Sequence, residues 1–315
     1  MLRRGRCRQA TVRRVAAHLA ASLCIVVHIG ARGNNMLAEV LDARAAFTVR
    51  TARDDERARR GCAYVAPADH HPLVLDDVIR LGRGPRENMS RPAIDPLLRS
   101  VGVSYGPRAI GVILTGMLND GAARLADMKR CGSVTVVQNP ADAEAADMLR
   151  GALTASDVDY RAPLADMPEL LLKLIAEAPG PAPAVPEDIC LEVEVALGRP
   201  ADAATTMRFA DPVAMSCPAC GGVLSRVRRW PPLRFRCQVG HAYTAETLAA
   251  QGEGNVDEAL RIALRIIEER VVLIGKMTDD ARRGGLDAAA RAYEQRAREC
   301  QDQVDVLRTA MRQSL

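Results

Sequence analysis

The sequence has few aromatic residues, no long apolar run and little net charge. Three Phe, five Tyr and one Trp occur in 315 residues, so a hydrophobic core must be built from Ala, Val, Leu and Ile. No apolar run reaches the roughly 18 residues of a membrane helix, and we expect no membrane insertion. Basic and acidic residues number 43 and 39, a net charge of +4. This balance is too even to indicate nucleic-acid binding, and we expect no nucleic-acid partner.

The nine cysteines do not form the pattern of a disulfide scaffold. Six are scattered along the chain, and three lie close together with a His in the C-terminal half. Such usage is typical of a reducing compartment, and we expect a cytoplasmic protein. The Arg-rich start, followed by apolar residues 15–27, has the order of a signal peptide. Cleavage there would remove the first predicted strand of the domain, which favours the cytoplasmic interpretation.

The residues from 110 to 121 combine a buried strand, a turn and the start of a helix. Ile110–Leu114 is a short apolar run typical of a parallel strand, and Gly116 and Gly121 permit a sharp turn. Working side chains of open α/β sheets gather at the carboxyl ends of such strands, where Asp120 is placed. Asp120 is therefore either a functional carboxylate or the N-cap of the helix that follows.

A second buried-strand pattern runs from Leu23 to Gly30 and carries His28 at its carboxyl end. A His and an Asp at the ends of two parallel strands can meet above one sheet edge, like the base and the orienting carboxylate of a hydrolytic triad. The alternative for His28 is a structural hydrogen-bonding role. We predict that the side chains of His28 and Asp120 lie within hydrogen-bonding distance.

These two segments and four others resemble the chemotaxis protein-glutamate methylesterase family. The quoted matches are Val-Val-His-Ile-Gly at 26–30, Tyr-Val-Ala-Pro at 64–67, Gly-Pro-Arg-Glu-Asn at 84–88, Arg-Pro-Ala-Ile-Asp at 91–95, Leu-Thr-Gly-Met at 114–117 with Asn-Asp-Gly at 119–121, and Val-Val-Gln-Asn-Pro at 136–140 with Ala143. Several motifs occur in order between about Leu23 and about Ile175. That order makes the resemblance specific.

The resemblance implies a parallel, Rossmann-like α/β domain that hydrolyses glutamate γ-methyl esters and releases methanol. Its partners would be methyl-accepting chemotaxis receptors or similar methylated signalling proteins. The family uses a Ser nucleophile, a His base and an Asp orienter. His28 matches the base and Asp120 the orienter, while Met117 matches a position beside the oxyanion site. Backbone amides at such a site stabilise the tetrahedral intermediate.

No candidate for the Ser nucleophile is found. In the family it stands in a Gly-rich turn some two dozen residues before the His, which corresponds to the Arg-rich first residues here. Ser22 is the only Ser before His28, and it starts the His28 strand instead of standing in a turn. Thr11 has no Gly-rich context. Either the chain starts after the strand that carries the nucleophile, or that strand is degenerate.

Strand and helix patterns alternate in the first half of the chain, which indicates βαβ units and a parallel sheet. Helical patterns occur at 34–43, from near Pro92, after Asp120 and at 141–153; strand patterns occur at 46–51, 62–67 and 134–138, with a hairpin at 73–81 that turns at Asp76-Asp77. We predict a methylesterase-like domain at 1–176, without its first strand and nucleophile turn, and a Pro-rich linker and connecting segment at 177–210. Residues 189–197 alternate and predict a strand.

Residues 211–250 are expected to form a zinc-ribbon-like module. Cys217 and Cys220 have the C-x2-C spacing of a metal knuckle, and Cys237 and His241 complete a tetrahedral set of ligands. Four protein ligands leave no open position, so a structural zinc ion is expected. The alternatives are a redox pair at Cys217 and Cys220, or unliganded thiols. Five nearby arginines are interpreted as a solvated face: Arg226, Arg228, Arg229, Arg234 and Arg236.

Residues 251–315 are expected to form an antiparallel helical hairpin. Apolar residues step by three or four from Leu260 to Thr278 and again from Leu286 to Met311, with Gly284-Gly285 between them. Two helices alone bury little surface. The hairpin should therefore dock on a partner, on the zinc-ribbon-like module or on a second copy, and self-association is expected.

The function expected is that of a protein-glutamate methylesterase, a serine hydrolase of chemotaxis signalling, impaired in this polypeptide because the Ser is absent. No aspartyl-phosphate receiver pattern precedes the α/β unit, so phosphorylation-gated activity is not implied. The alternative is a non-catalytic signalling scaffold that binds receptor or partner helices. A Ser-bearing Gly-rich turn would discriminate between the two.

Overall fold

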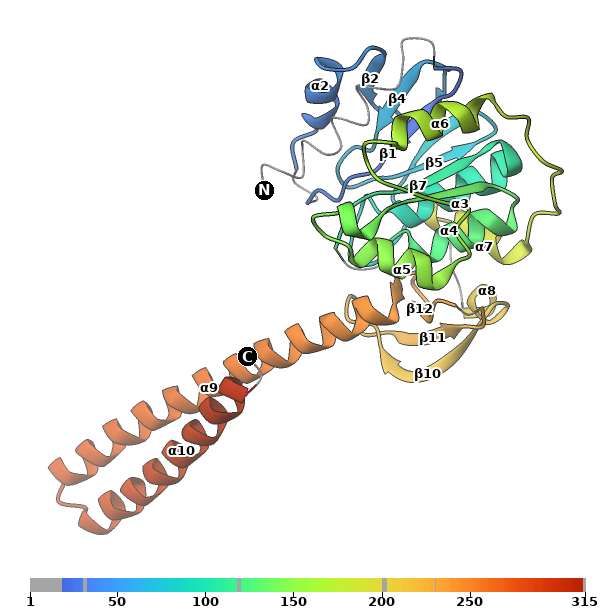
Figure 1. Cartoon of the computed structure of the whole chain (residues 1–315). Coiled ribbons are helices and arrows are strands. Elements are labelled where there is room, and N and C mark those ends of the chain that lie inside the picture. The colour runs from blue at the N-terminus through green and yellow to red at the C-terminus, as the bar shows by residue number, and fades with distance from the viewer. Residues whose placement is uncertain (1–18, 31–32, 118–119, 200–202, 230, 314–315) are drawn as a thin grey trace. The chain divides into compact units, whose positions relative to one another are not determined.

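The computed structural model describes residues 19–30, 33–117, 120–199, 203–229 and 231–313. It divides into two compact units, Met1–Leu248 and Ala249–Leu315, and each is described by itself. The first unit contains parallel and antiparallel sheets with their covering helices, and the second contains most of two long helices (Figure 1). The region in which the nucleophile was sought lies outside the described residues.

Two parallel three-stranded sheets confirm the predicted α/β class. The first has the order β1 (Leu23–Ile25), β4 (Cys62–Val65), β2 (Thr48–Thr51), and the second has the order β7 (Ile110–Ile113), β8 (Val134–Gln138), β9 (Tyr160–Ala162). The accompanying helices are α2 (Leu37–Asp42), α3 (Ile94–Tyr105), α4 (Ala122–Arg130), α5 (Asp147–Ala155), α6 (Met167–Ala176) and α7 (Glu187–Ala196). Strands β1, β4 and β7 are short, mainly apolar runs, as strands covered on both faces require.

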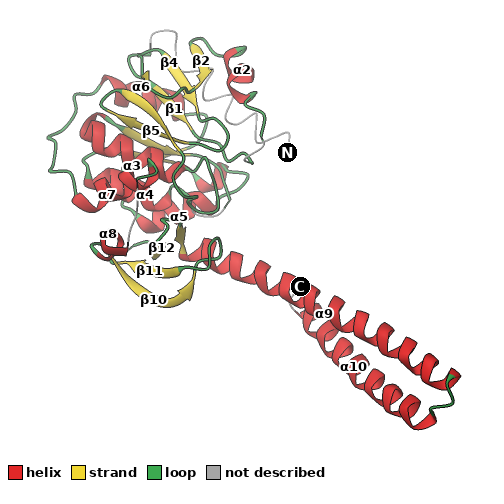
Figure 2. Ribbon diagram, turned by 180° about the vertical axis from the view of Figure 1, so that it is seen from behind, coloured by secondary structure: helices red, strands yellow, loops and turns green. Residues whose placement is uncertain are grey.

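Helix α3 joins two hydrophobic clusters of the first unit. Leu97 packs with Tyr64 and Val74, whereas Leu98 belongs to the cluster of Ile113 on β7. Consecutive residues of an α-helix point about 100° apart, so neighbouring leucines reach different clusters. Helices α3, α4 and α7 lie side by side (Figures 1 and 2).

The predicted hairpin at 73–81 is confirmed and packs on α3. It consists of β5 (His71–Leu75) and β6 (Val78–Gly82), and β3 (Glu56–Arg57) extends the sheet on the β6 side. Asp76 and Asp77 adopt φ values of 49° and 65°, the left-handed pair that a two-residue hairpin turn requires. The Val74 N–H donates to the Ser100 hydroxyl, which ties the hairpin to α3.

The prediction of a strand at 189–197 is wrong, because residues 189–196 lie in helix α7 and Leu197 is its C-cap. Pro186 precedes the helix, two acidic residues occupy its first turn, and Gly198 follows it with φ of 91°. Proline and acidic residues at the start and glycine at the end are helix signals. The apolar residues alternate only because the helix buries most of its surface, so Ile189, Val193 and Val195 are all buried.

One other predicted segment differs in extent from the element found. The helix expected at 141–153 begins later, since a short 3-10 helix, η2 (Pro140–Asp142), precedes α5. A second 3-10 helix, η1 (Gly106–Arg108), follows α3. Within the predicted linker and connecting segment at 177–210, the structure has the short helix α8 (Ala203–Met207) in addition to α7.

A four-stranded antiparallel sheet follows α8 and has the order β10 (Ala210–Ser216), β11 (Val223–Val227), β12 (Arg234–Cys237), β13 (Ala242–Thr244). The sequence suggested that the Pro-rich linker separates this sheet from the α/β core, but the sheet packs directly on that core. Ala242 forms a β-bridge with Glu87 and accepts a hydrogen bond from the Asn88 N–H at 2.8 Å. The interpretation of the arginines as a solvated face is wrong for Arg234 and Arg236, which are 5% and 1% exposed.

The second unit is the predicted helical hairpin, formed by α9 (Ala245–Arg283) and α10 (Asp287–Gln313). Gly285 adopts φ of 68° at the turn, where a side chain would be strained. Ion pairs between Arg308 and Glu268 and between Arg282 and Glu294 cross from one helix to the other in antiparallel register. Among the described residues, no helix is long and apolar enough to cross a membrane.

Candidate functional site

His28 and Asp120 lie in hydrogen-bonding contact, although 92 residues separate them in the sequence. His28 Nε2 is 2.5 Å from Asp120 Oδ2. His28 follows β1, and Asp120 stands in the turn between β7 and α4. The imidazole is 35% exposed and the carboxylate 3%. An accessible imidazole backed by a buried carboxylate is the arrangement that lets a His accept a proton from a substrate-side group.

The Asp120 carboxylate is held by two further donors. The Ile94 N–H donates to Oδ2 at 2.7 Å, and the Asn88 amide donates to Oδ1 at 3.1 Å. Burial alone would raise the pKa of Asp120, but the hydrogen bond and charge of His28, together with these donors, lower it. Asp120 is therefore a fixed, ionised partner for His28.

The alternative that Asp120 caps the following helix is wrong. Gly121 is the N-cap of α4 and has no side chain, whereas the Asp120 carboxylate accepts the first N–H of α3, that of Ile94. Gly121 adopts φ of 86°, and a Cβ there would lie 2.6 Å from Ile113 Cδ1. Its N–H donates to Asp95 Oδ1 at 2.8 Å. The turn that presents Asp120 thus requires glycine and is anchored by a second buried carboxylate.

Met117 stands at the carboxyl end of β7 and is 55% exposed. The backbone beneath it is fixed, because the Thr115 N–H donates to Gln138 Oε1 and the Gly116 N–H donates to the Ala145 carbonyl, both at 3.0 Å. The turn places Met117 in the same loop as Asp120.

Ser22 is not positioned to act with His28. It precedes β1, whereas His28 follows that strand. Six residues of extended chain span on the order of 20 Å, far beyond hydrogen-bonding distance. Ser22, the only Ser among the described residues before His28, therefore does not supply a nucleophile to the pair.

Glu192 lies at the centre of a buried charge cluster behind the site. Its carboxylate contacts Arg99 at 3.0 Å, Arg124 at 2.9 Å, Arg234 at 3.1 Å and Arg236 at 3.0 Å. The side chains of all five residues are at most 6% exposed. Arg99 lies on α3 and Arg124 on α4. Arg234 and Arg236 both lie on β12. One carboxylate therefore joins the antiparallel sheet to the α/β core.

Three more carboxylates balance the arginines of this cluster. Glu87 contacts Arg99 at 2.5 Å, and Arg124 contacts Asp95 at 3.1 Å and Asp127 at 2.5 Å. Burial would raise the pKa of Glu87, but the adjacent guanidinium groups, Arg99 first, lower it to about 2. A buried charge is tolerated only when it is paired, and here four arginines face four carboxyl groups. Burial raises the pKa of one of these carboxyl groups, Asp95, to about 7 despite the adjacent Arg124.

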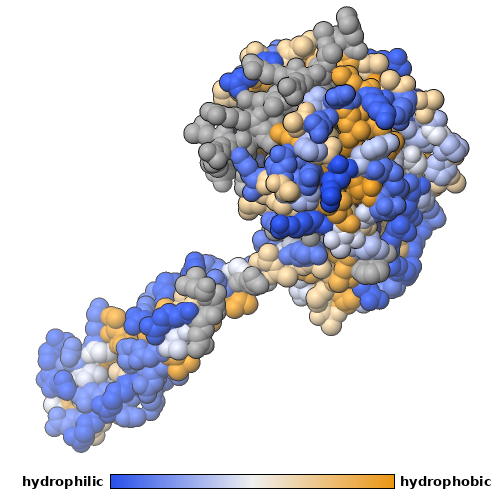
Figure 3. Space-filling model, viewed as in Figure 1, coloured by the Kyte–Doolittle hydropathy of each residue, from blue (hydrophilic) through white to orange (hydrophobic). Residues whose placement is uncertain are grey.

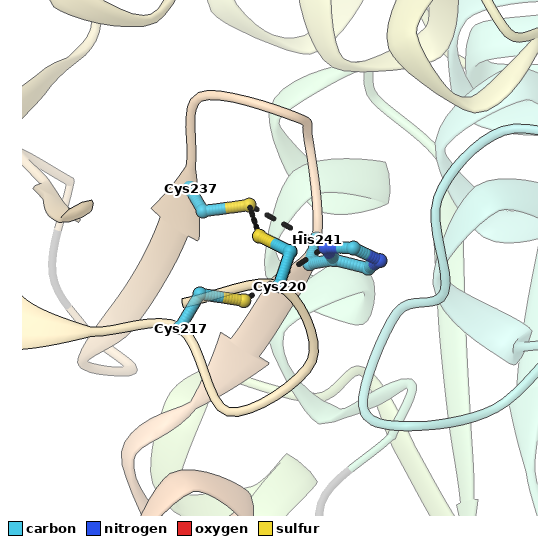
Figure 4. A group of neighbouring side chains, drawn as sticks. All are labelled: Cys217, Cys220, Cys237 and His241. Carbon is cyan, nitrogen blue, oxygen red and sulfur yellow. Dashed lines mark hydrogen bonds between the residues drawn. The ribbon is translucent and has the colours of Figure 1, made fainter. Parts of the chain in front are cut away.

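The four predicted metal ligands converge on one point (Figure 4). Cys217 and Cys220 come from the loop between β10 and β11, and Cys237 and His241 from the turn between β12 and β13. Sγ of Cys220 and Cys237 are 3.7 Å apart, and His241 Nδ1 lies 3.8 Å from the Cys217 sulfur and 3.5 Å from that of Cys237. Bonds of 2.3 Å to a central zinc ion would put tetrahedral sulfurs about 3.8 Å apart, whereas a disulfide brings them to about 2 Å.

The protonation behaviour of these groups fits a cation site. Burial would raise the pKa of Cys217, but hydrogen bonds from the Tyr243 hydroxyl and from backbone N–H groups outweigh it and lower the pKa. Burial lowers the pKa of His241 and favours the neutral ring that a metal ion requires. Burial and the charge of Cys217 raise the pKa of Cys237 to about 11, an unfavourable pairing of thiolates that a divalent cation would relieve.

The comparison with protein families identifies the α/β unit. The family model described as CheB methylesterase matches residues 8–171, more than half of the chain. The chain belongs to the CheB methylesterase family. His28, Asp120 and Met117 all fall within the matched region of this methylesterase domain, whereas the Cys-rich sheet and the helical hairpin lie beyond it.

Curated relatives carry the same assignment in their names. The chain is 39% identical over 153 residues to a Leptospira interrogans protein provisionally named protein-glutamate methylesterase/protein-glutamine glutaminase, covering 48% of this chain and 79% of that protein. It is 35% identical over 158 residues to the protein-glutamate methylesterase/protein-glutamine glutaminase 1 of Paramagnetospirillum magneticum, covering 49% of this chain and 42% of the relative. Both relatives are therefore named as protein-glutamate methylesterases.

A solved structure shares the fold of the CheB methylesterase domain. The catalytic domain of CheB methylesterase from Thermotoga maritima superposes with a TM-score of 0.50 at 27% sequence identity. The match covers 54% of this chain and 94% of that domain. The α/β unit thus corresponds to nearly the whole of that catalytic domain.

Three groups of the site were not predicted from the sequence: the amide of Asn88, the backbone N–H of Ile94 and the carboxylate of Asp95. All three lie in segments already matched to the family, at 84–88 and 91–95. The available signal was a set of polar residues in a stretch that leads directly into an apolar helix. Asn88 and Asp95 are 4% and 2% exposed, and buried polar groups need partners.

Proposed function

We propose that His28 and Asp120 are the general base and the orienting carboxylate of a protein-glutamate methylesterase site. The observation that carries this proposal is the 2.5 Å contact between an accessible imidazole and a buried, ionised carboxylate. Methyl-accepting chemotaxis receptors, or similar methylated signalling proteins, are the proposed substrates.

The proposed reaction is acyl transfer from a glutamyl side chain. His28 takes a proton from a hydroxyl nucleophile as that oxygen attacks the ester carbonyl, and Asp120 stabilises the imidazolium that forms. Backbone amides near Met117 are proposed to receive the charge on the carbonyl oxygen. Methanol leaves with the proton from His28, and water then releases the free glutamate. An amide substrate would release ammonia by the same steps, as the glutaminase in the relatives' names suggests.

The nucleophile must be supplied by a residue placed beside His28, and we propose that this polypeptide alone has little activity. The test is methanol release from a receptor with labelled methyl esters, comparing the chain with and without an added Ser-bearing turn. The rival proposal is a non-catalytic scaffold that binds receptor or partner helices near the same site. It predicts receptor binding by the added-turn chain without turnover.

We propose that residues 211–250 form a zinc-ribbon-like module, with a structural zinc ion held by Cys217, Cys220, Cys237 and His241. The sulfur and nitrogen separations of 3.5–3.8 Å support four-coordinate binding. A redox pair of Cys217 and Cys220 would not need the other two ligands. We also propose the four predicted domain limits, which are 1–176, 177–210, 211–250 and 251–315.

We expect about one equivalent of zinc in the purified protein. In the zinc-bound protein, Cys217, Cys220 and Cys237 should resist alkylation, and a chelator should expose all three together. Elemental analysis and mass spectrometry after iodoacetamide treatment measure both quantities. The half-buried cysteine Cys190 on α7 lies outside the cluster and is the internal control, because its rate of alkylation should be the same with and without chelator. Well under one equivalent of metal, with freely alkylated Cys217 and Cys220, would refute the site.

We further propose that the second unit associates with a second copy. Its surface is mostly hydrophilic with scattered apolar side chains (Figure 3). On α9, Ile262, Ile266 and Leu273 are 44%, 46% and 58% exposed and step by four and seven. A stripe at this spacing is typical of a second helix–helix contact. Sedimentation should show a dimer that Ile266→Glu makes monomeric; a wild-type monomer at high micromolar concentration would contradict this proposal.

A further inference from the structure

One side chain connects the candidate metal centre to the candidate active site. The Asn88 amide donates to Asp120 Oδ1 at 3.1 Å, and its carbonyl accepts the Thr244 N–H at 2.9 Å. The backbone N–H of Asn88 donates to the Ala242 carbonyl at 2.8 Å. Asn88 is 4% exposed and adopts φ of 47°, a left-handed conformation that asparagine tolerates. These three hydrogen bonds, with a longer one of 3.5 Å from the amide to Asp95 Oδ2, fix both ends of this residue.

The strand that holds Asn88 adjoins two of the candidate metal ligands. Strand β13 begins at Ala242, the residue after His241, and it pairs with β12, which ends at Cys237. The Cys237 N–H donates to the His241 carbonyl at 3.0 Å and closes the turn between the two strands. An ion bound by Cys237 and His241 would fix this turn, and with it the first residues of β13.

We propose that the metal centre positions Asp120 through β13 and Asn88, so that ion binding tightens the His28–Asp120 pair. Asn88 is a positioning residue, because it acts on the site through Asp120. This inference rests on the proposed function of the pair. It adds a coupling between the module at 211–250 and the methylesterase site, with a divalent zinc-like cation as the effector.

The chemistry of an amide suits this position. Asn88 must donate to a carboxylate on one side and accept an N–H on the other, and a primary amide does both without a charge. Aspartate at residue 88 would place a second carboxylate against Asp120. Burial raises the pKa of Asp95 and lowers that of His71, and the negative charge of Asp120 acts to raise both. Neither residue is changed in any variant proposed below.

The test is the titration of the His28 imidazole, followed by NMR in the full-length zinc-loaded protein. Asp120→Asn should lower the midpoint of His28 by about 1–3 pH units, because it removes an adjacent opposite charge. Asn88→Gly should lower the same midpoint by at least about half a unit, since a loosened carboxylate interacts less with the imidazole. Glycine accepts the left-handed backbone at residue 88. Asp76→Gly makes the same kind of change at φ of 49° in an exposed turn and should have no effect.

The direction in which Asn88→Gly moves the His28 midpoint shows whether Asn88 positions Asp120 or only donates a hydrogen bond to it. If Asp120 stays in place without the amide, it becomes more basic and the His28 midpoint stays or rises, which overturns the proposal. If Asp120→Asn itself has no effect, the His28–Asp120 pair and the proposed function both fail. If Asp120→Asn lowers the midpoint and Asn88→Gly does not, only the positioning role fails.

The coupling to the ion is tested by its reciprocity. Asn88→Gly should weaken zinc affinity at least about 5-fold relative to Asp76→Gly, measured by competition with a chromophoric chelator. Chelation should lower the His28 midpoint in the wild type, zinc should restore it, and neither should change it in Asn88→Gly. The His70 and His71 signals report whether the metal-free chain stays folded. Equal zinc affinity in Asn88→Gly and Asp76→Gly would overturn the coupling. This comparison does not depend on whether the metal-free chain stays folded.

Discussion

The 315-residue chain should release little or no methanol from a receptor that carries labelled glutamate methyl esters. The same chain with a first strand and a Gly-Ala-Ser turn fused ahead of Leu19 should gain about four to six orders of magnitude in rate. The physical reason is that His28 and Asp120 can only orient and activate what is placed beside them. Under our proposal no hydroxyl nucleophile stands beside the pair, which can then at best activate water, with no nucleophile turn to supply amides to the oxyanion.

Two variants decide what any observed activity means. In the extended chain, His28→Ala should remove nearly all of the gained rate, whereas replacing the added Ser with Ala should remove it and prevent a covalent acyl-enzyme. Mass spectrometry after substrate quenching detects that intermediate. Robust turnover by the unextended chain, abolished by His28→Ala, would contradict the prediction, because another nucleophile would then be acting.

The parts of the site that could be predicted from sequence share one property. Each depends on short-range spacing or on a rule of topology. His28 and Asp120 meet because residues at the carboxyl ends of parallel strands share an edge, even with 92 residues between them. Cys217 and Cys220 converge because the tight turn of a C-x2-C knuckle brings both thiols to one side. Asp76 and Asp77 form a hairpin turn because both tolerate positive φ.

The parts that could not be predicted depend on partners distant in the sequence. Arg236 looks like a surface residue until Glu192, 44 residues earlier, is placed beside it. Asn88 meets Thr244 across 156 residues, and no local pattern encodes that contact. Helix α7 was mistaken for a strand for the same reason. Its inward face carries Glu192, so the apolar periodicity of the helix is interrupted where the charge cluster lies.

Glu192→Gln should destabilise the first unit by about 3–5 kcal/mol, the loss typical of breaking a buried ion pair by removing one charge. The variant keeps the shape of the side chain but leaves four guanidinium groups, those of Arg99, Arg124, Arg234 and Arg236, around a neutral amide. Urea unfolding followed by circular dichroism gives the loss in free energy of unfolding. Glu194→Gln is the matched control on the same helix. Its carboxylate is 40% exposed and pairs with exposed Arg199, so it should cost less than about 1 kcal/mol.

The same variant should change how stability depends on acid. Burial would raise the pKa of Glu192, but Arg124 and the other guanidinium groups hold it well below its usual value. A carboxylate whose pKa is lower in the folded state contributes stability above its unfolded pKa, near 4.5, and that contribution is lost as the pH falls through the folded value. Wild-type stability should therefore decline below about pH 4.5. Glu192→Gln should decline less steeply, with Glu87, whose pKa is about 2, supplying part of the slope that remains. Equal slopes, or a loss below about 1 kcal/mol at neutral pH, would show that Glu192 does not hold the Cys-rich sheet to the methylesterase core.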